Sequence, residues 1–353
     1  MKERSELPDL FRCDDGTRVR SAAQWQRRRQ EIRDLIVRIE YGGLPPVPAE
    51  TRWEELHAAT VEHLGGALFI SGRVTTGPDR PFGFLMQIIV PPGEGPFPVV
   101  LTGDACWRYA TDEVVAEILH RGRIFAQFNR VEIVPDVYRS ERVSGLYPVY
   151  PDGNYGALAA WAWGYHRCVD VLLSMKFVDA SRIAIVGHSR GGKAVLLAGA
   201  TDERIALTAA NNSGAGGAGC YRVQGPQSET LADLMRAVPY WFGPSMLDYV
   251  GRENDLPFDQ HFLKSLIAPR ALLTTEAHAD LWANPTGTMQ THLAAREVYR
   301  FLNAEDRIGI SFREGGHDHG QVDWKAFLDF MDCQLCGKKP ERRFDRNPFP
   351  DTK

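Results

Sequence analysis

The sequence predicts an α/β protein with a mostly parallel central sheet between two layers of helices. From residue 98 onward, short continuous apolar runs alternate with helical stretches, which is the pattern of strands buried on both faces of a sheet. The runs occupy residues 98–102, 124–128, 183–186, 205–208, 271–275 and 308–312, and the helical stretches occupy residues 112–120, 155–174, 190–200, 286–303 and 322–335. No internal repeat interrupts this alternation.

The N-terminal part of the chain predicts one helix followed by antiparallel strands. Residues 21–41 carry an apolar stripe on an otherwise basic helix, and Gly-Gly-Leu-Pro-Pro at residues 42–46 ends it. Residues 52–90 alternate between apolar and polar side chains, as half-buried strands do. We expect a single domain over residues 1–353, made of an extension at 1–95, a core at 96–336 and an extended tail at 337–353.

Composition narrows the classes of function. Apolar residues make up 44% and charged residues 24% of the chain, which excludes wholesale disorder. With 41 basic and 45 acidic residues, the net charge of -4 provides no field for nucleic acid or an anionic membrane. The N-terminus lacks the apolar segment of a signal peptide, so we expect a cytoplasmic protein, or a secreted one whose leader has been removed. A small, largely neutral substrate and a monomer are expected.

The cysteines and histidines do not indicate a metal or a cofactor. Six cysteines are too few for a disulfide scaffold in a chain of this length. Cys333 and Cys336 form a lone C-x-x-C without a second pair, and His317-x-His319 lacks a third ligand. The Gly-rich segment 211–220 lacks the lysine of a phosphate-binding loop. We therefore expect no metal, no nucleotide and no cofactor.

A candidate nucleophile lies between the run at 183–186 and the helix at 190–200. Residues 187–191 read Gly-His-Ser-Arg-Gly, which fits G-x-S-x-G, the tight turn that presents a serine between a strand and a helix. Flanking glycines are needed there because side chains would collide in so sharp a turn. The pattern predicts Ser189 as nucleophile in an α/β-hydrolase fold, a three-layer αβα sandwich. The alternative is a Gly-rich turn with an incidental serine.

A serine needs a base, and the base needs an acid to orient it. In α/β-hydrolases the acid and then the histidine follow the serine along the chain. His317, in a glycine-bounded loop after the last apolar run, is the expected base, with His319 as its rival. Asp280, in the loop after the run at 271–275, is the expected acid, with Glu276 as its rival.

Three further residues are candidates for contacts with a substrate. Arg190 begins the helix after Ser189, so its N–H, and its guanidinium if it curls back, can stabilise an oxyanion. The alternative for Arg190 is an ion pair with an acid on the helix surface. Lys193 lies one turn further on the same helix face and suits sugar hydroxyls, unless it is a plain exposed lysine. Trp282 offers a plate for a sugar ring, although an isolated tryptophan is more often core.

Several stretches together resemble one family. Gly-His-Ser-Arg-Gly-Gly-Lys-Ala at 187–194, Asn-Asn-Ser-Gly-x-Gly-Gly at 211–217 and Gly-Gly-His-Asp-His at 315–319 occur in order with Val-Pro-Tyr-Trp-Phe at 238–242 and Leu-Ile-Ala-Pro-Arg-Ala-Leu-Leu at 266–273. This set resembles carbohydrate esterase family fifteen, the glucuronoyl esterases, and bacterial members in particular. The resemblance implies hydrolysis of esters between 4-O-methyl-glucuronic acid on xylan and alcohols of lignin, without a metal.

The resemblance also assigns roles and shows departures. It implies Ser189 as nucleophile, His317 as base and Arg190 as oxyanion donor, and it adds Glu229 to Lys193 and Trp282 as a sugar contact. Fungal members place the triad glutamate at the position of Asn212, and an amide cannot stabilise an imidazolium as a carboxylate does. Asp280 is therefore expected as the acid.

Other departures and the alternatives also bear on what we expect. His188 and Gly320 stand where fungal members have a half-cystine pair, and Cys220 has lost its partner, so free thiols are expected. The alternatives are an acetyl-xylan esterase or general carboxylesterase of the same fold, and a non-catalytic carbohydrate-binding protein.

Overall fold

The computed structural model describes residues 6–137 and 142–349. The strands are β1 (Glu50–Val61), β2 (Ala67–Gly77), β3 (Phe82–Val90), β4 (Phe97–Thr102), β5 (Ile124–Phe128), β6 (Val178–His188), β7 (Leu207–Asn211), β8 (Ala271–Ala277) and β9 (Ile308–Arg313). The helices are α1 (Ala22–Ile39), α2 (Asp112–His120), α3 (Arg130–Ile133), α4 (Ala157–Ser174), α5 (Arg190–Thr201), α6 (Leu231–Ala237), α7 (Gln260–Ser265), α8 (Pro285–Phe301) and α9 (Gln321–Cys336).

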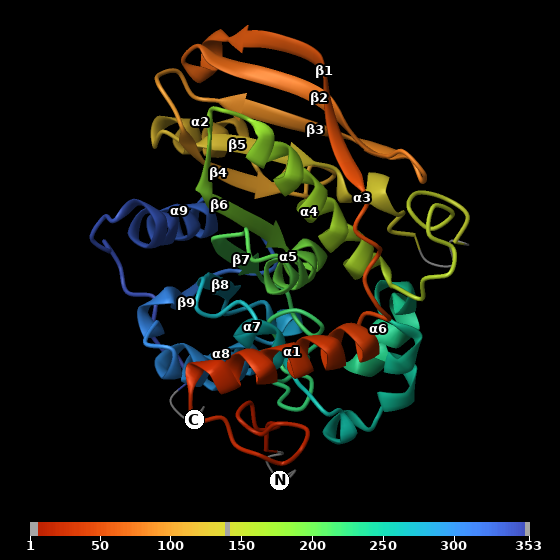
Figure 1. Ribbon diagram of the computed structural model, residues 1–353. Helices are drawn as coiled ribbons and strands as arrows, with labels where there is room; N and C mark the ends of the chain where they lie inside the picture. The colour runs from red at the N-terminus through yellow and green to blue at the C-terminus, as the bar shows by residue number, and fades with distance from the viewer. Residues whose placement is uncertain (1–5, 138–141, 350–353) are drawn as a thin grey trace.

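The strands form a sheet in the order β1-β2-β3-β5-β4-β6-β7-β8-β9. β1, β2 and β3 pair antiparallel, and β3 pairs antiparallel with β5. From β5 to β9 all the neighbouring strands are parallel, so their carboxyl ends share one edge of the sheet. Figure 1 shows the antiparallel strands at one end of the molecule and the parallel strands in its centre. Functional side chains in such sheets gather at the carboxyl edge.

Alternate residues along the central strands face two apolar cores. Val99 and Leu101 of β4 pack into the core beneath α1, α4, α5 and α8, while Val100 between them packs into the core beneath α2 and α9. Helices therefore cover both faces, and Figure 1 shows α9 on one side of the sheet with α4 and α5 on the other. The predicted fold class, an α/β-hydrolase sandwich with an antiparallel extension, is confirmed.

The predicted elements differ from the structure in a few places. The run at 205–208 was too early by two residues: Ile205 lies in a turn in which its N–H bonds to Asp202, and β7 begins at Leu207. The short helices α3, α6 and α7 were not predicted, because four to seven residues contain too little periodicity to identify a helix. The first helix, predicted over residues 21–41, is α1 at Ala22–Ile39, and it packs against α7.

The tail contacts the last strand. The N–H of Ile310 in β9 donates to the carbonyl of Phe344 at 2.7 Å, and the Phe344 ring lies against Phe330 of α9 with 4.9 Å between centroids. Between α9 and residue 349 the chain forms neither helix nor strand, apart from an isolated bridge between Asp345 and Ile310.

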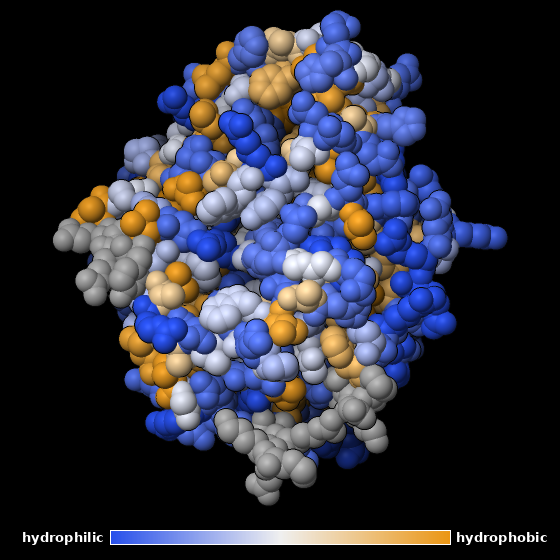
Figure 2. Space-filling model, turned by 180° about the vertical axis from the view of Figure 1, so that it is seen from behind, coloured by the Kyte–Doolittle hydropathy of each residue, from blue (hydrophilic) through white to orange (hydrophobic). Residues whose placement is uncertain are grey.

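Apolar and hydrophilic side chains are interspersed on the face of the molecule in Figure 2. The apolar ones lie in small separate groups. Of the helices in the described part of the chain, none combines the length and the apolar character needed to span a bilayer.

Candidate active site

Ser189 lies in a strained turn between β6 and α5. Its φ of 54° and ψ of -121° are unusual for a residue with a side chain. Its N–H donates to the carbonyl of Asn211 at 2.8 Å, which ties the turn to the end of β7. The flanking glycines are required by contact: a Cβ on Gly187 would meet the Gly191 carbonyl, and one on Gly191 would meet the carboxylate of Asp104. The local sequence therefore specifies the elbow that the motif predicts.

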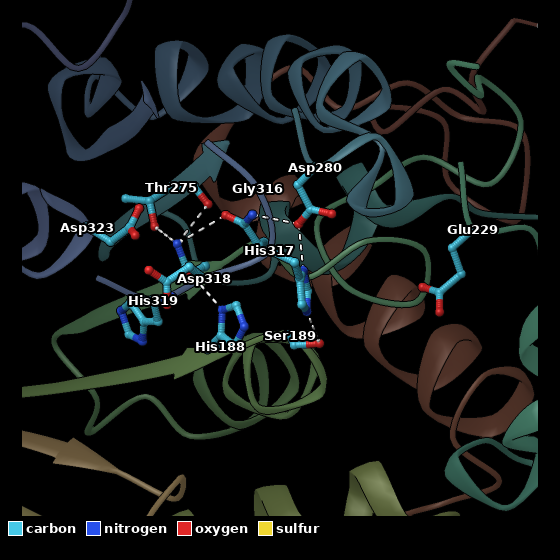
Figure 3. Close-up of polar contacts among 12 residues, drawn as sticks. His188, Ser189, Glu229, Thr275, Asp280, Gly316, His317, Asp318, His319 and Asp323 are labelled. Carbon is cyan, nitrogen blue, oxygen red and sulfur yellow. Dashed lines mark hydrogen bonds and ion pairs between the residues drawn. The ribbon is translucent and has the colours of Figure 1, made fainter. Parts of the chain in front are cut away.

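His317 and Asp280 reach Ser189 from two other loops. His317 Nε2 lies 3.0 Å from Ser189 Oγ, and His317 Nδ1 lies 2.6 Å from Asp280 Oδ2. The His317 side chain is 43% exposed, whereas that of Asp280 is 3% exposed. Figure 3 shows the three side chains in one line, with Asp280 and Ser189 at opposite ends of the His317 ring. The base is thus open to solvent while the acid is enclosed.

Asp280 remains a carboxylate despite its enclosure. It lies in the loop between β8 and the short 3₁₀ helix Leu281–Ala283. Burial alone would raise its pKa, but the hydrogen bonds from His317 and Asn212 outweigh burial and lower the pKa of Asp280 below its usual value. Asn212 Nδ2 donates to Asp280 Oδ2 at 2.6 Å. The amide therefore supports the acid from the place where the resemblance would put a glutamate.

The two rival residues lie elsewhere. Glu276 is fully buried within β8, where burial raises the pKa of its carboxyl well above the usual range, and His317 bonds to Asp280 instead. The His319 ring stacks on Trp324 with 4.6 Å between centroids, and burial lowers the pKa of His319 well below its usual value. Both are buried groups whose neutral forms are favoured, so they fit a packing role rather than the roles of acid and base.

Arg190 is held by an acid that the sequence analysis did not identify. Its Nη1 lies 2.9 Å from Asp136 Oδ2, and Asp136 Oδ1 accepts hydrogen bonds from Tyr240 at 2.8 Å and Trp241 Nε1 at 2.9 Å. Burial would raise the pKa of Asp136, but the charge of Arg190 and these hydrogen bonds lower it. The guanidinium also lies 4.8 Å from the centre of the Trp241 ring. Arg190 is thus paired with a loop acid near the elbow rather than with an acid on the helix surface.

Lys193 and Glu229 form a second ion pair beside the elbow. Lys193 is not the exposed lysine of the alternative interpretation: its side chain is 3% exposed, and its Nζ lies 2.8 Å from Glu229 Oε2. Lys193 Nζ also donates to the carbonyl of Ala215. Trp282 is 50% exposed, so it is not a core residue, and its carbonyl accepts from the Glu229 N–H at 3.0 Å. All the side chains predicted as substrate contacts therefore lie on loops or helix ends at the carboxyl edge.

No pattern in the sequence pointed to Asp136 or to the supporting function of Asn212. The Val-Pro-Tyr-Trp-Phe stretch was noted, but nothing in it indicated that Tyr240 and Trp241 share one carboxylate located 104 residues or more upstream. Among residues 6–137 and 142–349, no three His, Cys, Asp or Glu side chains are grouped to hold a metal ion. All six cysteines lie in these ranges and are free thiols.

A strained elbow serine that contacts a histidine, which in turn contacts an aspartate, on a sheet of this topology defines a serine hydrolase of the α/β-hydrolase class. Comparison with known proteins specifies the family. A family model described as "Glucuronyl esterase, fungi" matches residues 75–303. The chain belongs to the glucuronoyl esterase family, which consists of carboxylic ester hydrolases, and the resemblance inferred from its motifs is confirmed.

Curated relatives agree with this family. The 4-O-methyl-glucuronoyl methylesterase of Podospora anserina is 35% identical over 327 residues, which cover 89% of this chain and 64% of that protein. The 4-O-methyl-glucuronoyl methylesterase 1 of Wolfiporia cocos is 31% identical, with 89% of this chain and 76% of that protein covered. The chain therefore spans less of the Podospora relative than of the Wolfiporia one.

Solved structures agree as well. The family fifteen glucuronoyl esterase of Caldicellulosiruptor kristjansonii superposes with a TM-score of 0.85 at 30% identity, covering 98% of this chain and 94% of that one. A mutant of the enzyme from Sporotrichum thermophile, in complex with methyl 4-O-methyl-β-D-glucopyranuronate, has a TM-score of 0.79 at 27% identity, covering 98% and 92%.

Proposed function

We propose that this chain hydrolyses esters between the carboxyl group of glucuronic acid, with or without its 4-O-methyl group, and an alcohol, as in lignin–carbohydrate linkages. The observation that carries the proposal is the line of contacts from Ser189 through His317 to Asp280, at 3.0 and 2.6 Å. The similarity to methylesterases of 4-O-methyl-glucuronic acid supports the substrate class. A free or oligosaccharide-bound uronate ester is the expected substrate.

The first half of the reaction transfers the acyl group to the enzyme. Ser189 Oγ bonds to the ester carbonyl carbon while its proton passes to His317 Nε2, and the carbonyl electron pair moves onto the oxygen. Asp280 stabilises the imidazolium through Nδ1. When the intermediate collapses, the bond to the alcohol oxygen breaks, and that oxygen takes the proton from Nε2. Water then repeats these steps on the acyl-enzyme, which releases the glucuronic acid and restores Ser189.

The oxyanion needs positive charge that is present before the reaction begins. The N–H of Arg190 is among the first four of α5, which have no acceptor within their own helix. The Arg190 side chain is 34% exposed and held by Asp136, so a permanent cation stands beside the elbow. Donors of this kind are effective because they require no rearrangement as the charge develops.

Hydroxyl groups of the sugar ring have partners next to the carbonyl site. Lys193 and Glu229 together offer an ammonium and a carboxylate that share one ion pair, which allows donation to and acceptance from adjacent hydroxyls. The half-exposed ring of Trp282 provides an apolar surface for one face of the sugar. A uronate ester suits this arrangement because its carbonyl is attached directly to the ring.

The alternative, an acetyl-xylan esterase or a general carboxylesterase, is not favoured by the comparisons. Initial rates on benzyl glucuronate, methyl glucuronate, acetylated xylan and nitrophenyl acetate separate the two functions. We expect kcat/KM to be highest for the glucuronate esters, and a preference for acetate would favour the alternative.

Two serine variants test the mechanism with the same substrates. Ser189→Ala should abolish turnover and labelling by a fluorophosphonate. Ser181→Ala, a surface change on β6, the strand that leads to the elbow, should retain both. Wild-type turnover by Ser189→Ala would contradict the mechanism.

A further inference from the structure

A chain of buried side-chain hydrogen bonds connects the elbow to the triad acid behind His317. His188, the residue before Ser189, bonds through Nδ1 to Asn211 Oδ1. Asn211 Nδ2 donates to Asn212 Oδ1 at 3.2 Å and to Thr275 Oγ1 at 2.9 Å. Asn212 Nδ2 donates to Asp280 Oδ2 at 2.6 Å. Each of these side chains is at most 5% exposed, so water does not compete for the bonds.

The donors and acceptors along this chain allow only one arrangement. Asn212 must direct its NH₂ group at the Asp280 carboxylate, which leaves its oxygen facing Asn211. Asn211 therefore directs its NH₂ group at Asn212 and its oxygen at His188. The His188 Nδ1 must then carry a proton and donate. Burial lowers the pKa of His188 to about 4, so the ring is neutral at the pH where the base works.

The same His188 ring packs against the base. Its centroid lies 4.6 Å from that of His317, and Figure 3 shows the two rings side by side, with Asp280 and Ser189 at the ends of His317. Tyr109, at 4.6 Å, and His319, at 5.6 Å, fix His188 from its other sides. The His317 ring is therefore held at Nδ1, at Nε2 and by one neighbouring ring, while the rest of it faces solvent.

We propose that His188 and Asn212 are positioning residues for His317. The two amides tie the ring that packs on the base to the carboxylate that orients the base, so that the direction of Nε2 toward Ser189 is maintained through both proton transfers. This inference rests on the proposed function. It adds a supporting chain that uses neutral groups only, which leaves Asp280 as the carboxylate that responds when His317 becomes charged.

Other ionisable groups lie against this chain: Asp104 Oδ2 accepts the His188 backbone N–H at 2.8 Å, and the rings of Tyr109 and His319 pack on His188. Burial and the nearby charge of Asp280 both raise the pKa of the Glu276 carboxyl well above its usual value, so Glu276 is neutral. Asp318 acts on His188 through its charge, and His317 opposes that effect. Of the groups named, only His317 takes up and releases a proton in the proposed reaction.

Asn212→Leu tests the link to the acid. It removes the donor to Asp280 with little change in volume, so we expect kcat on benzyl glucuronate to fall about tenfold to a hundredfold, with KM changed much less. Without the amide donor the carboxylate becomes more basic and stabilises the imidazolium more, so the acid limb of kcat/KM should move to higher pH. Asn254→Leu, an exposed change in the short helix Glu253–Asp255, is the control.

His188 variants test the packing independently, in case Asn212→Leu does not fold. His188→Ala removes the ring and should lower kcat more than His188→Phe, which retains a ring but not the hydrogen bond. His57→Ala on the exposed edge strand β1 controls for loss of a histidine. A wild-type kcat and pH profile in folded Asn212→Leu, or in His188→Ala, would overturn the proposal.

Failure of the proposed function is distinguished by a substrate without a sugar. Nitrophenyl acetate and a fluorophosphonate both need His317 but not a glucuronate. If the wild-type protein hydrolyses nitrophenyl acetate and is labelled by the fluorophosphonate but does not hydrolyse glucuronate esters, the substrate assignment is wrong. Slower reaction of the Asn212 and His188 variants with these two reagents would still support the positioning role.

Discussion

Two groups of residues flank Ser189 and differ in their electrostatics. The imidazole side consists of His317 and the residues that support it, and the cation side consists of Arg190 and Lys193 with their partners. On the imidazole side, Asp280 is surrounded by neutral donors, His317 and Asn212. On the cation side, each positive charge already has its own carboxylate: Arg190 has Asp136, and Lys193 has Glu229. The carboxylates on both sides are largely buried, yet only one side holds permanent ion pairs.

The difference follows from what each side does in the proposed reaction. A proton moves onto His317 and off again, so its acid must respond to a charge that exists only transiently. A permanent cation beside Asp280 would weaken that response. The oxyanion, by contrast, needs a cation already in place, and buried cations require partners to offset their desolvation. Trp241 joins the two ion pairs, since its ring lies 4.8 Å from the Arg190 guanidinium and 5.8 Å from Lys193 Nζ.

The largest effect is expected from Asp280→Asn. The amide does not stabilise the imidazolium and permits the wrong tautomer, so kcat on benzyl glucuronate should fall by about 10⁴. Glu276→Gln is the matched control, because that carboxyl is buried without contact to His317 and should leave kcat within about threefold of the wild type. Equal losses of kcat in the two variants would mean that Glu276 also acts on His317.

Arg190→Met should have the next largest effect. It retains the length of the side chain and removes the charge, so we expect kcat to fall about 10²-fold to 10³-fold. Arg182→Met, on β6 ahead of the elbow and paired with Asp179, controls for the loss of an arginine. If kcat is unchanged and only KM rises, the guanidinium binds the ground state and does not stabilise the oxyanion.

Asp136→Asn would break the contrast between the two sides by making the partner of Arg190 neutral. The amide retains an oxygen for Tyr240 or Trp241 but loses its charge, so kcat should fall about tenfold, which is less than in Arg190→Met. Kinetics of the double variant would check the coupling: if Asp136 acts through Arg190, adding Asp136→Asn to Arg190→Met should cost little more.

Lys193→Met and Glu229→Gln should affect recognition more than chemistry. Loss of one hydrogen bond to the sugar should raise KM for benzyl glucuronate about fivefold, with kcat less affected. Nitrophenyl acetate has no sugar, so its KM should not change, and a parallel increase for both substrates would indicate a distorted elbow instead.

The smallest effect is expected on the pH dependence of folding stability, through His319 on the imidazole side. Burial lowers the pKa of His319 well below its usual value, so below pH 6.5 the unfolded chain binds a proton that the folded protein does not. Stability is therefore lost as the pH falls. His319→Phe retains a ring against Trp324 but has no proton to bind. When the pH is lowered from 7.5 to 5.5, its free energy of unfolding, measured with urea, should fall by about 1 kcal/mol less than that of the wild type. An identical pH dependence in both proteins would place the acid sensitivity elsewhere.

Much of the architecture was readable in short stretches of sequence. The elbow follows from local rules, because only glycines fit beside Ser189 and because a buried strand and a helix flank it. The long helices were predicted to within a few residues, since the apolar periodicity of α2, α4 and α9 repeats over several turns. The three short helices were not predicted for lack of such a repeat.

The site was only partly readable. Ser189, His317 and Asp280 could be selected because each follows a strand whose carboxyl end lies at the same edge. The partners of the cations could not be selected. Asp136 is one of 45 acidic residues and lies in a loop without a distinctive pattern.

What the residues dictate alone is therefore the fold, the elbow and the order of the reacting groups, because these depend on neighbours close along the chain. Only folding decides that Asp136 anchors Arg190, and that His188 and Asn212 lie on one hydrogen-bonded path. Those choices depend on which side chains become buried together, and burial is a property of the packed molecule rather than of any segment.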